Sequence, residues 1–113
     1  MCSQSELQTV TRSVVEATVE ILEDKIYKII LYGSYARGDF DSESDIDIMI
    51  LLDCTSEEVK KYRKLINKLA SRIGLENDIE VSLLLRDRTS FEERLNLLPF
   101  YQKVQKEGVA LYG

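Results

Sequence analysis

The stretch at residues 33–49, GSYARGDFDSESDIDIM, decides the fold because it joins two apolar runs through a polar loop. The run at residues 26–31 leads into this stretch and is predicted to form a buried strand, which stops at Gly33 and Ser34. The run at residues 48–52 is predicted to form a second strand. A turn that contains glycine and serine therefore ends one strand, and a pair of carboxylates begins the next.

These two carboxylates belong to Asp45 and Asp47. Residues two apart share one face of a strand, so both carboxylates point the same way, while Ile46 and Ile48 point into the core. Two carboxylates side by side repel each other, and the arrangement is costly unless a cation lies between them. Mg²⁺ prefers oxygen ligands and is usually held by one or two carboxylates together with substrate phosphates. The pair therefore predicts a magnesium site for a phosphorylated substrate.

The turn at Gly33 and Ser34 offers backbone N–H groups and a hydroxyl at the place where a triphosphate would lie. Together with the two carboxylates, this turn predicts a metal-dependent phosphoryl or nucleotidyl transfer site. The alternative is an Asp-rich turn between two strands of an ordinary protein.

The whole pattern resembles the DNA polymerase β-like nucleotidyltransferase superfamily, whose signature is Gly-Ser, a short loop and then Asp-x-Asp. Here the signature is Gly33-Ser34 followed by Asp45-Ile46-Asp47. The segment Ala36-Arg37-Gly38 and the residue Ser44 also match the form GSxARG…SDIDL of the minimal nucleotidyltransferases. The resemblance covers residues 26–85 well and the two ends in outline.

The resemblance implies Mg²⁺ as the cofactor and ATP or another nucleoside triphosphate as the substrate. It also implies a set of nucleotide-binding residues, which are Gly33, Ser34, Arg37 and Ser44. Gly33 and Ser34 would hold the β- and γ-phosphates. Arg37 pairs either with a phosphate oxygen or with Asp39 or Asp41 of its own loop, and the sequence leaves both possibilities open.

A third carboxylate is expected in the segment at residues 77–85, NDIEVSLLL, which is predicted to form a third strand. A helix connects it to the second strand, so the two strands should be parallel, with a right-handed crossover. Asp78 and Glu80 then lie near Asp45 and Asp47, on one face of the third strand. Relatives usually carry a third carboxylate here, often within a V-D-L-type segment. The resemblance favours Glu80 as a metal ligand and catalytic base, with Asp78 second. The alternative is a rim carboxylate paired with a lysine.

Helical periodicity surrounds the three strands. One helix is predicted over residues 5–23, and a second runs from a capping box at Thr55 to about Ile73, with Gly74 as its stop. Two helices are also predicted near the C-terminus.

The first of these C-terminal helices covers residues 90–97 and opens with a capping box at Ser90. The second covers residues 100–107 and follows Pro99, which fits the first turn of a helix. Residues 109–112 form either an edge strand or a segment that packs across a helix. We therefore expect an α/β fold, with a small mixed β-sheet, helices packed mainly on one face, and the site at one end.

Length and composition agree with a single domain over residues 1–113, large enough for one core and too short for two. The net charge of −5 gives no basic surface that indicates nucleic-acid binding. No apolar run approaches the ~20 residues of a membrane helix. Histidine is absent, which excludes histidine-based catalysis. The two cysteines, Cys2 and Cys54, are expected to be reduced thiols of a cytoplasmic protein.

Three functions remain open. The first is an enzyme that moves NMP, with AMP as the first choice, onto a hydroxyl of a partner protein. The minimal family commonly pairs with a small helical HEPN protein as antitoxin and toxin, and adenylylation of a toxin tyrosine silences the toxin. The second is a non-catalytic binding module that neutralises its partner by contact. The third is a small-molecule nucleotidyltransferase that is completed by homo-oligomerisation.

Overall fold

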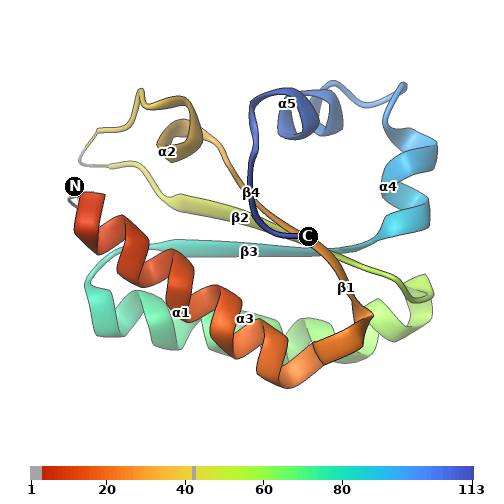
Figure 1. The fold of residues 1–113 in the computed structure, drawn as a ribbon, viewed down its shortest axis with the longest axis horizontal. Coiled ribbons are helices and arrows are strands. Elements are labelled where there is room, and N and C mark those ends of the chain that lie inside the picture. Colours follow the sequence, from red (N-terminus) through yellow and green to blue (C-terminus); the bar gives the residue numbers. More distant parts are fainter. Residues whose placement is uncertain (1–3, 42) are drawn as a thin grey trace.

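A computed structural model describes residues 4–41 and 43–113 of the chain, and Figure 1 shows its elements. Cys2 lies outside these residues, whereas Cys54 is a free thiol. The elements, in chain order, are α1 (Gln4–Leu22), η1 (Glu23–Lys25), β1 (Ile26–Tyr32), α2 (Ser34–Arg37), β2 (Ile46–Leu52), α3 (Ser56–Asn77), β3 (Val81–Asp87), α4 (Arg88–Arg94), α5 (Pro99–Glu107) and β4 (Val109–Tyr112).

The sheet is mixed, with strand order β3-β2-β1-β4. β1 is antiparallel to both β2 and β4, whereas β2 and β3 are parallel and are joined through α3. The parallel pairing confirms the prediction for the third strand. Of the two alternatives for residues 109–112, the edge strand is the one that forms, as β4. The register places Tyr32 opposite Asp47 on one side and Ser82 beside Asp47 on the other.

Helices cover both faces of this sheet (Figure 1), whereas the sequence predicted them mainly on one face, because α4 and α5 bury a second apolar cluster. The long helices α1 and α3 pack on one face, where Ile46 and Ile48 are fully buried as predicted. The short helices α4 and α5 cover the other face, and their Phe91 and Tyr101 pack with Met49 and other residues of the sheet. Every residue of β2 except the second is buried, and that second residue is Asp47. A charged side chain therefore stands in the most buried strand of the sheet.

The predicted end of α3 at Gly74 is wrong, because the helix continues to Asn77 and ends where Asp78 adopts the left-handed conformation (φ 52°, ψ 46°). The carbonyl of Gly74 accepts hydrogen bonds from the amides of Asp78 and Ile79. A Cβ at Gly74 would lie 2.7 Å from the Ile79 carbonyl oxygen. Gly74 therefore allows the backbone of Ile79 to pass close to the helix. The third strand, β3, begins at Val81 and not at residue 77.

The predicted cap of α4 is also wrong. Asp87, and not Ser90, is the N-cap, and its side chain accepts a hydrogen bond of 2.9 Å from the Ser90 amide. Asp87 lies one turn before Ser90, and its carboxylate accepts a hydrogen bond from a backbone N–H group that has no partner within the helix. α5 agrees with its prediction and has Pro99 in its first turn.

No helix within residues 4–41 and 43–113 is both long and apolar enough to cross a membrane.

Candidate active site

Gly33 brings the end of β1 into contact with Asp47. Its backbone has φ 79° and ψ −159°, a region that is essentially restricted to glycine. A Cβ at this position would lie 2.5 Å from Oδ2 of Asp47 and 3.3 Å from its Cγ. The Gly33 carbonyl accepts hydrogen bonds of 3.1 Å from the amides of Ala36 and Arg37 and so begins α2. The Gly-Ser turn and the second aspartate of the motif therefore form one compact unit.

The Asp45–Asp47 pair is electrostatically strained. Asp47 is half-buried, and its burial raises the pKa of its carboxyl group above the ordinary value. The charge of Asp45 raises this pKa further, while the charge of Arg37 opposes the shift. A divalent cation between the two carboxylates would remove their repulsion. The pair, which consists of oxygen donors, fits Mg²⁺ with phosphate oxygens as further ligands.

Two aromatic side chains, those of Tyr32 and Phe100, lie on the side of Asp47 that β1 occupies, and the sequence did not predict this arrangement. Burial, followed by the charge of Asp47, raises the pKa of Tyr32 to about 12, and Arg86 acts against this shift. The ring of Tyr32 packs edge-on against Phe100 of α5, with 5.5 Å between the ring centroids. The one signal in the sequence was the position of Tyr32 directly before Gly33. Burial and the neighbouring carboxylate both favour the neutral phenol of Tyr32.

The loop before β2 is held by Asp41 and Ser44. The hydroxyl of Ser44 accepts a hydrogen bond of 2.9 Å from the Asp41 amide and donates one of 3.3 Å to the Asp41 carboxylate. The same carboxylate accepts a hydrogen bond of 2.9 Å from the Glu43 amide. Ser44 thus fixes the approach to Asp45, and its predicted contact with the nucleotide stays a prediction.

Arg37 pairs with one of the loop carboxylates that the sequence offered and with one that it did not. Its Nε lies 3.1 Å from Oδ2 of Asp39, and its Nη1 lies 3.4 Å from Oε2 of Glu107. Glu107 belongs to α5, so this contact ties α2 to the C-terminal helix. The predicted contact of Arg37 with a phosphate stays a prediction.

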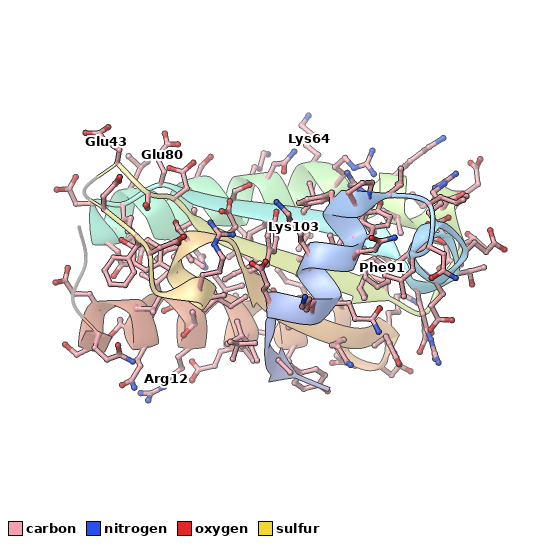
Figure 2. All side chains as sticks on the ribbon, turned by 90° about the horizontal axis from the view of Figure 1, so that it is seen from above. Arg12, Glu43, Lys64, Glu80, Phe91 and Lys103 are labelled. Carbon is pink, nitrogen blue, oxygen red and sulfur yellow. The ribbon has the colours of Figure 1, made fainter. Side chains whose placement is uncertain are left out.

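The candidates for the third carboxylate lie at the rim. Asp78 is the left-handed cap of α3 and lies outside the strand. Glu80 is exposed, although its carbonyl accepts a hydrogen bond of 3.0 Å from the Ile46 amide. Figure 2 shows Glu80 at the end of the molecule where the loop with Glu43 lies. In residues 4–41 and 43–113, no three acidic, histidine or cysteine side chains are grouped closely enough to hold a metal ion.

The residue of β3 that the register places beside Asp47 is Ser82. Leu83 and Leu85 point into the core under α1 and α3, so Ser82 lies on the opposite face, which is also the face of Asp47. Val81-Ser82-Leu83 thus has the V-x-L form with a serine in place of the acid. The alternation of residues in β3 indicates which face of the sheet Ser82 lies on. Only the strand register shows that Ser82 lies beside Asp47.

The fold and this site define a nucleotidyltransferase. The family model described as the nucleotidyltransferase domain matches residues 12–111, and the chain belongs to this family. Two proteins of Methanocaldococcus jannaschii, each named "Putative protein adenylyltransferase", are similar to it. The first is 46% identical over 69 residues, which cover 61% of this chain and 68% of the relative. The second is 35% identical over 88 residues, which cover 78% and 80%.

A crystal structure of a toxin–antitoxin with AMP-PNP has a similar fold. The TM-score is 0.59 at 24% identity, and the match covers 91% of this chain and 73% of that chain. At this identity the likeness shows the fold alone.

Proposed function

We propose that the chain transfers AMP from ATP, with Mg²⁺, onto a hydroxyl group of a partner protein. The contact between the Gly33 turn and Asp47 carries this proposal, because it places the Gly-Ser turn against one carboxylate of the aspartate pair, and the charge of Asp45 acts on that carboxylate. The two relatives named for protein adenylyltransferase activity support the choice of AMP and of a protein acceptor.

The aspartate pair, the Gly-Ser turn and Arg37 each have a role in this proposal. Asp45 and Asp47 hold Mg²⁺, which neutralises charge on the phosphates and on the leaving pyrophosphate when it is bound. Gly33 and Ser34 orient the β- and γ-phosphates through the backbone N–H groups and the hydroxyl. Arg37 exchanges one of its exposed carboxylate partners for a phosphate oxygen, which costs little because surface ion pairs are weak.

The reaction is a displacement at the α-phosphorus. The oxygen of the acceptor hydroxyl forms a bond to this phosphorus, and the bond between the phosphorus and the α–β bridging oxygen breaks. Pyrophosphate leaves with the electron pair of that bond. Glu80, with Asp78 as the second choice, takes the proton of the hydroxyl as a general base.

The acceptor in this proposal is a helical protein of the HEPN type, with the chain acting as its antitoxin in the cytoplasm. The toxin–antitoxin structure with the similar fold supports this choice. The segment between α4 and α5 offers a contact surface, since Leu97, Leu98 and Phe100 are 75%, 39% and 44% exposed. Phe100 also contacts Tyr32, so a protein bound to this apolar segment would reach the site.

One observation favours a second candidate function, a module that binds its partner without turnover. The described residues contain no three-carboxylate group, and a serine lies beside Asp47. A site of this kind would bind MgATP through Asp45 and Asp47 and would lack the base for the transfer.

Incubation with α-labelled ATP, Mg²⁺ and the protein encoded by the neighbouring gene tests the proposal, with intact mass spectrometry of both chains. We expect the label on the partner and a mass increase of one AMP. MgATP binding without transfer would establish the binding module. Label on a small molecule in place of the partner would overturn the choice of acceptor. The control is the Asp45→Asn, Asp47→Asn double variant.

A further inference from the structure

The flank of α5 that faces the candidate site carries Lys103 between two residues with defined contacts. Phe100 packs against Tyr32, and Glu107 pairs with Arg37. Lys103 lies three residues after Phe100 and four before Glu107, so these three side chains line one flank of the helix. Figure 2 shows Lys103 on the side of α5 that faces α2. Along this flank of the helix, Lys103 therefore lies between the residue that contacts Tyr32 and the residue that pairs with Arg37.

The charges near Tyr32 and Arg37 are mostly negative. Asp47 lies opposite Tyr32 in the sheet, Asp45 directly precedes β2, and Arg37 already has Asp39 and Glu107 as partners. A nucleoside triphosphate would add several negative charges, more than one Mg²⁺ and a paired arginine can neutralise. Besides Arg37, the charge of Arg86 already acts on Tyr32, and a bound triphosphate would favour a further cation at the phosphates.

Lys103 is a cation of this kind. It is exposed, and within residues 4–41 and 43–113 it has no ion pair, whereas Lys25 and Arg72 each have one and Arg37 and Arg88 each have two. A lysine ammonium is a compact charge on a flexible stem, and it binds phosphate oxygens as a point charge. Because Lys103 stands opposite α2, it faces the part of the site where the β- and γ-phosphates are placed.

We propose that Lys103 binds the β- or γ-phosphate of a nucleoside triphosphate and so selects triphosphates over monophosphates. This inference rests on the proposed function, since it uses the nucleotide position given by Gly33 and the aspartate pair. It assigns a part in nucleotide binding to the C-terminal helix, which lies outside the Gly-Ser and Asp-x-Asp motif.

The test compares four proteins: the wild type, Lys103→Ala, Lys103→Arg and Lys106→Ala. Lys106 is an exposed lysine of the same helix and serves as the matched control. Each protein is titrated with AMP and with the Mg²⁺ complex of an ATP analogue that has a methylene group in the α–β bridge, which prevents transfer. Melting curves check that each variant is folded.

We expect Lys103→Ala to bind the triphosphate analogue about tenfold more weakly, the size of one charge-assisted contact, and to bind AMP with unchanged affinity. Lys103→Arg should restore most of the loss, and Lys106→Ala should behave as the wild type. The loss should shrink at high salt, because exposed charges are screened.

Equal analogue affinities of wild type and Lys103→Ala would overturn the inference and leave the proposed function intact. Equal losses for the analogue and AMP would also overturn it, because the effect would then lie in the fold or the base. A wild type that does not bind the analogue would overturn the proposed function, and this inference with it.

Discussion

The turn at Gly33 and the segment that enters β3 both bring polar residues to the same end of the sheet. The turn is defined within a few residues, because the glycine-only backbone of Gly33 and its contact with Asp47 leave little choice. The segment at residues 78–82 is positioned instead by the length of α3 and by the parallel register of β3. A local motif therefore identifies the reaction class, whereas the residues that complete the site depend on the packing of distant elements.

The largest effect is expected from Asp45→Asn combined with Asp47→Asn, which removes the charges of the motif. Mg²⁺-dependent nucleotide binding should be lost, because amide oxygens cannot neutralise the cation. The fold should be at least as stable as the wild type, since the repulsion between like charges disappears. Calorimetric titration with MgATP checks the binding, and thermal melting checks the fold. Unchanged MgATP affinity would show that the metal lies elsewhere.

Gly33→Val should also lose triphosphate binding, because a branched side chain would enter the space of the Asp47 carboxylate. The backbone region of Gly33 excludes other residues at a cost of ~1–3 kcal/mol, so a matching loss of stability is expected. The control is Gly38→Ala. Gly38 also has a positive φ of 87°, but nothing lies within 4 Å of a Cβ at that position.

Gly38→Ala should therefore lose stability through backbone strain alone and keep its affinity for ATP. Urea titration and ATP binding of both variants separate the two effects. Normal ATP binding by Gly33→Val would place the phosphates away from this turn, and equal binding losses in both variants would assign the effect to loop strain.

Most of the fold was predictable from the sequence, because apolar periodicity and capping residues act locally. The order of the strands and of the longer helices, the parallel pairing of β2 with β3, and the helix after Pro99 agree with the structure, whereas η1 and α2 were not predicted. The end of α3 was not predictable from Gly74, since this glycine makes room for the Ile79 carbonyl. That approach depends on how the chain turns after the helix.

The candidate site also has a part that the sequence predicted and a part that it did not. Gly33 and Asp47 were identified from the spacing of the motif, and the structure joins them. The contact of Arg37 with Glu107 spans 70 residues, and the position of Ser82 beside Asp47 depends on the register. No local pattern contains such long-range contacts, so the sequence alone did not reveal them.

Glu80→Gln tests the segment that enters β3. If Glu80 is the base, the transfer rate should fall by ~10²–10⁴-fold, with little change in ATP affinity, because Asp45 and Asp47 are intact. Asp78→Asn should be nearly silent. Single-turnover transfer of labelled AMP to the partner measures both variants. The reverse pattern would assign the base to Asp78, and wild-type rates in both single variants and the double variant would exclude both residues.

The smallest effect concerns the stability of the unliganded protein as a function of pH. The pKa of Asp47 is raised in the folded state, so the folded chain holds this proton at a pH where the unfolded chain has lost it. The free energy of unfolding should therefore fall as the pH rises through the window between the two pKa values. Asp47→Asn lacks this loss and should be more stable than the wild type at pH 7. The gain should be on the order of 0.5 kcal/mol, because water screens a half-exposed charge.

Asp45→Asn is the matched control. It removes the charge of Asp45, which is the second cause of the raised pKa of Asp47, and keeps the burial of Asp47, which is the first. Burial raises the pKa of Asp47 more than the charge of Asp45 does, so Asp45→Asn should give the smaller gain at pH 7. Both gains should shrink as the pH falls through the window between the raised and the ordinary pKa of Asp47, and they should vanish below it, because Asp47 is then protonated in the folded and unfolded states alike. Urea titrations in EDTA at several pH values measure the three proteins. A gain from Asp47→Asn that is absent at pH 7, or that persists unchanged in acid, would show that the Asp47 charge is not strained. The Asp47 carboxylate beside Gly33 would then be stable in the folded protein without a cation.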